Sequence, residues 1–153
     1  MSLSPRSLPP GLIVDATDAL PLHVVTLASF AGWRAAQDGA TQAWIDAHGF
    51  NGSASTALVL PGDGGAASAV IGVADPIDPY SYGHAPYALP VRTWTPAATL
   101  AADELAALQL GWGLGSYRFN RYRQPLRAPA QLQLASFDDD MLAQLSASLR
   151  VRD

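Results

Sequence analysis

Three glycines alternate with large apolar residues in a part of the chain where a helix is expected. The run Leu110–Arg123 reads L-G-W-G-L-G-S-Y-R-F-N-R-Y-R. Glycine inside a helix costs about 1 kcal/mol relative to alanine, so Gly111, Gly113 and Gly115 together cost about 3 kcal/mol. Gly111 and Gly115 are four residues apart and share a helix face. The pattern predicts that another element packs closely against this face, with a frayed helix end as the alternative.

Hydrophobic periodicity and flanking residues predict three helices. The first is expected over Thr41–His48, because Gly49 suits the position just after a helix end. The second is expected over Thr99–Tyr117 and carries the glycines. The third is expected over Ser136–Val151.

Short runs rich in β-branched and apolar residues predict five strands. Pro61–Gly65 is expected to be a hairpin loop, and Asp75–Pro86 an irregular loop or a short helical turn. The alternation of strands and helices predicts an α/β fold, with a mixed, partly antiparallel sheet flanked by helices. The expected strands are Leu22–Leu27, Thr56–Leu60, Ser68–Val73, Ala88–Trp94 and Gln131–Ala135.

Length and composition favour one globular domain. The chain has 153 residues, of which 49% are hydrophobic and 14% are charged, as in an ordinary compact domain. Residues 1–19 are expected to be a flexible leader and residues 20–153 a single domain. There is no cysteine, which excludes disulfides and thiolate metal sites. No apolar run reaches the roughly 18 residues of a spanning helix, and we expect a cytoplasmic location.

The charge pattern argues against most anionic partners. All nine basic residues are arginine, and the net charge is -4, so nothing attracts nucleic acid or anionic lipid in general. Four arginines (118, 121, 123 and 127) lie in a stretch without acids between Leu105 and Phe137. Aromatic residues interleave with them, a pattern that can also suit single-stranded nucleic acid. We favour an interface with a neighbouring domain or subunit.

The candidate catalytic and metal-binding residues lack the spacing that such sites need. His23, His48 and His84 are far apart and form no H-x-x-x-H pair. Three aspartates at 138–140 fall at the start of the last expected helix, where acids stabilise the helix dipole. Gly62–Gly65 precedes a strand, whereas a phosphate-binding loop leads into a helix. We therefore assign no catalytic, cofactor-binding or metal-binding residue to this chain.

Part of the glycine-bearing run has the pattern W-x-L-G-x-Y-x-F-x-R-Y. This pattern resembles the end of the N-terminal domain in bacterial members of the leucyl (cytosol) aminopeptidase family. Three further segments resemble family segments in the same order: Gln42–Phe50, a helix before the first hairpin; Pro86–Trp94, the strand before the glycine-bearing helix; and Arg150–Asp153, the residues before the catalytic domain. The motif residues are Trp112, Leu114, Gly115, Tyr117, Phe119, Arg121 and Tyr122.

The resemblance implies a macro-domain-like fold and a non-catalytic role. In the family, two divalent metal ions (zinc or manganese) and a catalytic lysine and arginine belong to the C-terminal domain, and this chain is expected to stop before it. The chain would then shape access to the active site and support a hexamer, with the seven motif residues at an interface. Its partners would be the catalytic domain and further copies, and not a membrane or nucleic acid. Two alternatives stay open: a stand-alone macro-like binder of a nucleotide derivative, and a purely structural oligomerisation domain.

Overall fold

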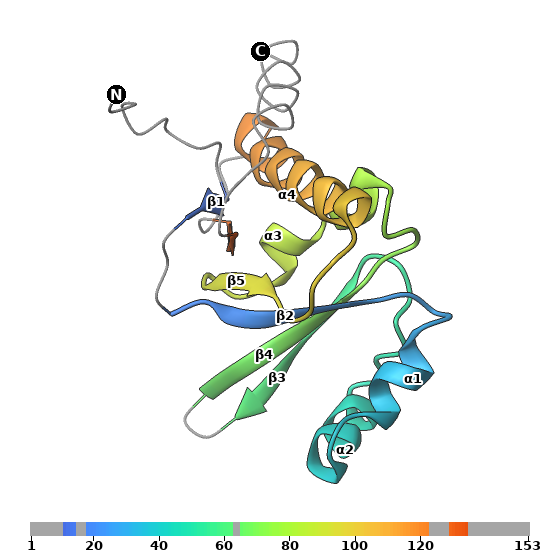
Figure 1. The fold of residues 1–153 in the computed structure, drawn as a ribbon. Helices are drawn as coiled ribbons and strands as arrows, with labels where there is room; N and C mark the ends of the chain where they lie inside the picture. The colour runs from blue at the N-terminus through green and yellow to red at the C-terminus, as the bar shows by residue number, and fades with distance from the viewer. Residues whose placement is uncertain (1–10, 15–17, 63–64, 123–128, 135–153) are drawn as a thin grey trace.

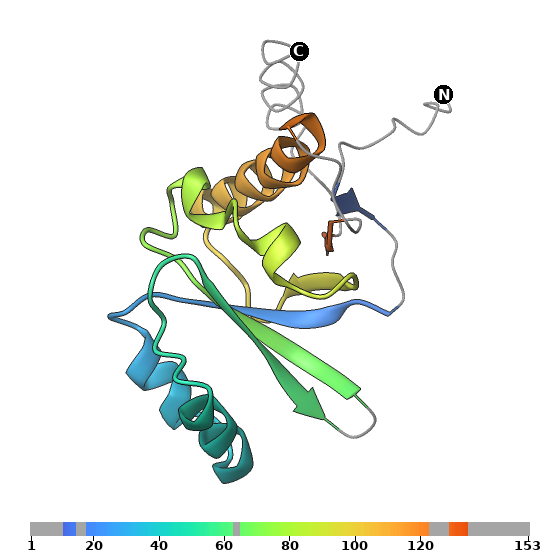
Figure 2. The ribbon, with the colours of Figure 1, turned by 180° about the vertical axis from the view of Figure 1, so that it is seen from behind.

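A six-stranded sheet forms the centre of the molecule (Figure 1). The computed structural model describes residues 11–14, 18–62, 65–122 and 129–134, with the backbone alone for 117–122. The strand order is β1-β6-β5-β2-β4-β3, and helices lie on both faces of the sheet (Figures 1 and 2). The expected α/β class with a mixed sheet flanked by helices is therefore confirmed. The strands are β1 (Leu12–Ile13), β2 (Leu20–Val25), β3 (Thr56–Gly62), β4 (Gly65–Gly72), β5 (Thr93–Pro96) and β6 (Gln131–Gln133).

The expected hairpin is present and supplies the only antiparallel pairing among the described strands. β3 pairs antiparallel with β4, and their last paired residues are Gly62 and Gly65. The other neighbours, β1 with β6, β6 with β5, β5 with β2, and β2 with β4, are parallel. Parallel neighbours need long crossovers, and the helices between the strands supply them.

Two apolar clusters occupy the two faces of the sheet. Side chains alternate along β4, because Ala69 and Ile71 point into the larger cluster and Val70 points into the smaller one. The larger cluster joins the sheet to α4 (Ala102–Tyr122), η1 (Pro79–Tyr82) and α3 (Ala85–Ala88). The smaller cluster joins β2, β3 and β4 to α1 (Phe30–Ala35) and α2 (Gly39–Ala47). Figure 1 shows these two groups of helices on opposite sides of the sheet.

The predicted and observed elements differ most in three places. The glycine-bearing helix covers Ala102–Tyr122, whereas the sequence predicted Thr99–Tyr117. The predicted strand Ala88–Trp94 is wrong: α3 ends at Ala88, and β5 begins only at Thr93. Pro86 lies in the first turn of the short helix and Pro90 follows its C-cap residue, so prolines and not the apolar run set the boundaries. Helix α1 has no counterpart in the sequence-based assignment.

The expected leader contains an ordered strand. Leu12 and Ile13 form β1, which pairs with Leu132 and Gln133 of β6, and Leu12 is buried. The expected helix Ser136–Val151 lies outside the described residues, as do the aspartates at 138–140. Within the part of the chain that the structure describes, no helix is both long and apolar enough to cross a membrane.

Candidate functional site

The glycine face of α4 lies directly against η1 and the residue that follows it. A Cβ on Gly111 would overlap the Pro79 carbonyl and lie 2.9 Å from Cβ of Tyr82. A Cβ on Gly115 would overlap the Gly83 carbonyl and lie 2.9 Å from Cα of Gly83. Real Cβ atoms do not approach backbone this closely. The prediction of close packing is confirmed, and its physical cause is backbone-to-backbone contact.

Trp112 anchors the same helix to the sheet side. Its side chain is fully buried, and its indole Nε1 donates a hydrogen bond of 3.0 Å to the carbonyl oxygen of Ala130. Ala130 precedes β6, and its own amide donates to Pro86 O at 2.7 Å. The indole therefore links α4 to the start of β6, and Ala130 continues the link to α3. Buried indoles usually have such a partner, because an unpaired N–H is costly in an apolar surrounding.

The neighbouring residues of α4 are also structural. Leu114 is half-buried and packs on the larger apolar cluster. Ser116 is buried and its hydroxyl donates to Trp112 O at 2.8 Å, while Tyr87 of α3 donates to Ser116 O at 3.1 Å. Gly11 packs against Ser116 so closely that a Cβ there would overlap the serine hydroxyl. This half of the motif therefore fixes α4 to its neighbours.

The other half of the motif continues the same helix. The backbone of residues 117–122 belongs to α4, so Tyr117, Phe119, Arg121 and Tyr122 follow the anchored turn that contains Gly115. Their side chains lie outside the described part of the structure, as do residues 123 and 127 of the arginine-rich stretch. The interface role of these residues therefore stays a prediction.

The fold keeps the three histidines apart in separate environments. His23 lies in β2, where burial lowers its pKa, and its ring is 5.5 Å from that of Trp33. His48 caps the end of α2 and stacks on Trp44 with 4.2 Å between ring centroids. His84 precedes α3, where burial lowers its pKa and Nε2 lies 3.1 Å from Thr56 O. No histidine pair of the kind that binds a metal results.

Tyr82 is a fully buried phenol on the glycine face. Burial raises the pKa of Tyr82 above its usual value, and the negative charges of Glu104 and Asp75 raise it further. The phenol therefore stays protonated and donates a 2.6 Å hydrogen bond to Pro76 O. This arrangement holds the loop before η1 in place and does not resemble an activated acid or base.

A surface pocket of about 300 Å³ lies at the amino ends of β5 and β6. Sequence reasoning did not identify it, because its residues are scattered along the chain and share no motif. Only the strand pairing brings them together, so no local signal could have found them. The lining residues are Asp18, Val91, Arg92, Thr93, Pro129 and Gln131.

Comparisons with known proteins agree with this architecture. The chain is similar, with a TM-score of 0.72 and 25% identity, to the crystal structure of cytosol aminopeptidase from Coxiella burnetii. The match covers 91% of this chain and 31% of that protein, so the chain spans about a third of its length. A tomato leucine aminopeptidase mutant also matches, at 16% identity and a TM-score of 0.45, over 99% of this chain and 37% of that one. No curated protein matches the chain by sequence.

The family assignment comes from the sequence match over most of the chain. Residues 20–135 match the model of the M17 aminopeptidase N-terminal domain. This range includes β2 to β6 and the whole of α4 with its glycine face. It also agrees with the resemblance of the Trp112–Tyr122 motif to the leucyl aminopeptidases. The chain belongs to the M17 aminopeptidase family and carries its N-terminal domain.

Proposed function

We propose that this domain is the non-catalytic N-terminal domain of a metal-dependent leucyl aminopeptidase, which removes N-terminal residues from peptides. The observation that carries the proposal is the family match over residues 20–135. The chain corresponds to about a third of the Coxiella burnetii enzyme. That share fits a domain that accompanies a separate catalytic domain.

The described residues do not fit a metal centre. Among them, no group of three or more His, Cys, Asp and Glu side chains could hold a metal ion. A catalytic centre with two metal ions needs several such ligands close together. We therefore assign the zinc or manganese ions to the catalytic domain of the parent enzyme and derive no chemical step from this domain.

The role that we propose for this domain is to support assembly and to shape access to the active site. Helix α4 is fixed to η1 and to the start of β6 by Gly111, Trp112 and Gly115. Residues 117–122, the last part of the same helix, therefore follow an anchored segment. We propose that Tyr117, Phe119, Arg121 and Tyr122 contact the catalytic domain or another copy of the protein. An arginine beside aromatic residues is a common composition for such contacts.

An activity assay of the 153-residue chain tests the non-catalytic role. The purified chain is incubated with leucine amide and either Zn²⁺ or Mn²⁺, and release of leucine is measured. We expect no turnover above the metal-only control. Metal-dependent hydrolysis by the pure chain would contradict the proposal.

The mass of the native protein tests its place in a larger enzyme. An antibody against this domain captures the protein from its source, and mass spectrometry gives the intact mass. A mass far above 16.0 kDa, with aminopeptidase activity in the captured material, is the expected result. A mass near 16.0 kDa would favour a stand-alone binder or a structural domain, and calorimetry with ADP-ribose would then separate those two.

A further inference from the structure

One half of a sheet face is not covered by the described helices. Trp94 of β5 and Leu132 of β6 point into the larger apolar cluster, so Thr93 and Gln131, one residue earlier in each strand, lie on the opposite face. Helices α1 and α2 are on that face too, but they pack against β2, β3 and β4 and not against β5 or β6 (Figures 1 and 2). Thr93 and Gln131 also line the pocket of about 300 Å³ at the amino ends of β5 and β6.

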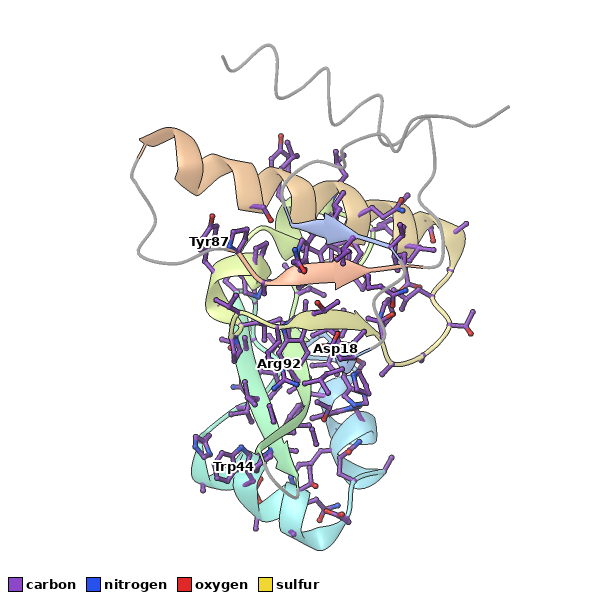
Figure 3. The ribbon with its side chains drawn as sticks, turned by 90° about the vertical axis from the view of Figure 1, so that its left-hand side faces the viewer. Asp18, Trp44, Tyr87 and Arg92 are labelled. Carbon is purple, nitrogen blue, oxygen red and sulfur yellow. The ribbon has the colours of Figure 1, made fainter. Side chains whose placement is uncertain are left out.

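Strand register brings two opposite charges to this pocket. β2 is parallel to β5, with Leu20 beside Trp94. Two residues before each of these come Asp18 and Arg92, and both line the pocket. Figure 3 shows the two side chains next to each other beside β5. The backbone of Arg92 is fixed to the start of β6, because its carbonyl oxygen accepts a 2.9 Å hydrogen bond from the amide of Gln131.

The two charges do not neutralise each other. Among the described residues, neither Asp18 nor Arg92 has an opposite charge within 4.0 Å, whereas Arg34 forms an ion pair with Asp46. Nearby, the Thr93 hydroxyl lies 3.3 Å from Gln131 Oε1, so the amide nitrogen of Gln131 is the group left to donate to a ligand. The pocket thus offers a carboxylate at one position and a guanidinium and an amide at another.

We propose that this pocket binds a zwitterionic α-amino acid. Its carboxylate accepts from Arg92 and Gln131, and its ammonium group donates to Asp18, which gives charge-assisted hydrogen bonds at both ends. A simple anion would face the Asp18 carboxylate, and a simple cation would face the Arg92 guanidinium. A molecule with both charges is therefore the class that satisfies both charged groups of the pocket.

The other lining residues and the pocket volume indicate the side chain and size of the amino acid. Val91 and Pro129 supply apolar surface, and Val91 is 52% exposed, so an apolar side chain on the amino acid has a surface to cover. The volume is at the lower end of the range of about 300 to 1,000 Å³ for small-molecule sites, which fits a single amino acid. The inference stands independently of the proposed function, because it concerns binding to this chain alone.

The test is an NMR titration of the ¹⁵N-labelled 153-residue chain with L-leucine. Two analogues serve as matched controls: N-acetylleucine lacks the ammonium charge and leucinamide lacks the carboxylate. We expect leucine to shift the amide signals of Thr93 and Gln131, and each analogue to bind at least about 10-fold more weakly, as expected for the loss of one hydrogen bond to a charged group.

Variants locate the binding site. Arg92→Gln and Asp18→Asn are each expected to weaken leucine binding at least about 10-fold. Arg34→Gln is the control, because it is the same substitution at an arginine in α1 that pairs with Asp46 and does not line the pocket. Melting curves confirm that each variant is folded.

Several results would overturn the inference. The absence of any shift with leucine would do so, and so would equal binding of N-acetylleucine, which would indicate a plain anion site. Equal binding of leucinamide would indicate a plain cation site. A loss of affinity in Arg34→Gln as large as that in Arg92→Gln would place the ligand elsewhere.

Discussion

The backbone of Gly115 in α4 lies against the backbone of Gly83, so closely that no side chain fits between them. Gly83 follows η1 and precedes α3. One contact therefore holds the family's glycine-bearing helix against two short elements that sit between β4 and β5. Glycine lowers helix stability at position 115, but it is needed there, because any Cβ would force α4 away from Gly83.

Replacing Gly115 should destabilise the domain despite the better helix propensity of alanine. Gly115→Ala is expected to lower the free energy of unfolding by about 1 to 3 kcal/mol, because the new methyl group meets fixed backbone. Urea unfolding followed by circular dichroism measures the change. The matched control is Gly32→Ala in α1, where nothing lies within 4 Å of the new Cβ and a gain of up to about 1 kcal/mol is expected. Equal effects of the two substitutions would contradict this account of α4.

The Trp112 indole should contribute more to stability than the Trp44 indole, which bonds to β3. Trp112→Phe leaves the Ala130 carbonyl without its partner in a buried place and removes packing volume, so we expect a loss of about 2 to 4 kcal/mol. Trp44→Phe removes a similar 2.9 Å bond to Val59 O at an exposed position, where a loss of about 1 kcal/mol or less is expected. Denaturant midpoints compare the two. A larger loss in Trp44→Phe would be inconsistent with the proposed anchoring role of Trp112.

Stability should fall as the solution becomes mildly acidic. Burial lowers the pKa of both His23 and His84 below the usual 6.5. The unfolded chain therefore binds protons first, and the free energy of unfolding, complete above about pH 6.5, decreases as the pH falls through the lowered folded-state values. Unfolding measured between about pH 7.5 and pH 5 should show this slope.

Removing a buried histidine should flatten the pH dependence. His84→Gln keeps a donor that can reach the Thr56 carbonyl but cannot gain a proton in this range, so its slope should be smaller than that of the wild type. His23→Leu should also reduce the slope, because leucine takes up no proton. The neighbouring Trp33 ring gives the leucine side chain an aromatic surface to pack on. Identical slopes in the wild type and in both variants would show that these two histidines do not cause the pH dependence.

Reversing the charge of Arg121 should weaken self-association. If residues 117–122 form an interface, Arg121→Glu should shift the protein to a smaller assembly in size-exclusion chromatography with light scattering. A dissociation constant at least about 10-fold higher is expected. Arg34→Glu is the control, since Arg34 lies in α1 on the other face of the sheet. An unchanged assembly in Arg121→Glu would show that residues 117–122 do not form the interface.

Features encoded by neighbouring residues were predictable from the sequence. The pair of β-type runs around Pro61–Gly65 predicted the β3–β4 hairpin, because strand and turn signals are both local. The glycines at 111 and 115 predicted close packing, because their spacing puts them on one helix face. The motif from Trp112 to Tyr122 pointed to the family, which the match over residues 20–135 then confirmed.

Short elements with weak local signals were not predictable. Helix α1 has no side-chain cap and contains Gly32, so packing must support it: Phe30 and Trp33 contact Phe50 across the smaller cluster. The run Ala88–Trp94 is as apolar as a strand, yet its buried residues, Leu89 and Trp94, face the larger cluster from a helix end and a separate strand. Periodicity alone does not separate these possibilities over so few residues.

The sequence by itself determined the α/β class, the hairpin, the glycine-bearing helix and the family, since residue types, local spacing and the order of segments along the chain carry these signals. Only the tertiary structure decided what the glycines pack against, and that Asp18, Arg92 and Gln131 line one pocket. Those groupings depend on the parallel pairing of β2, β5 and β6. Such pairing joins residues that are far apart in the chain, such as Leu20 with Trp94 and Thr93 with Gln131, through packing and backbone hydrogen bonds, for which no local pattern carries a signal.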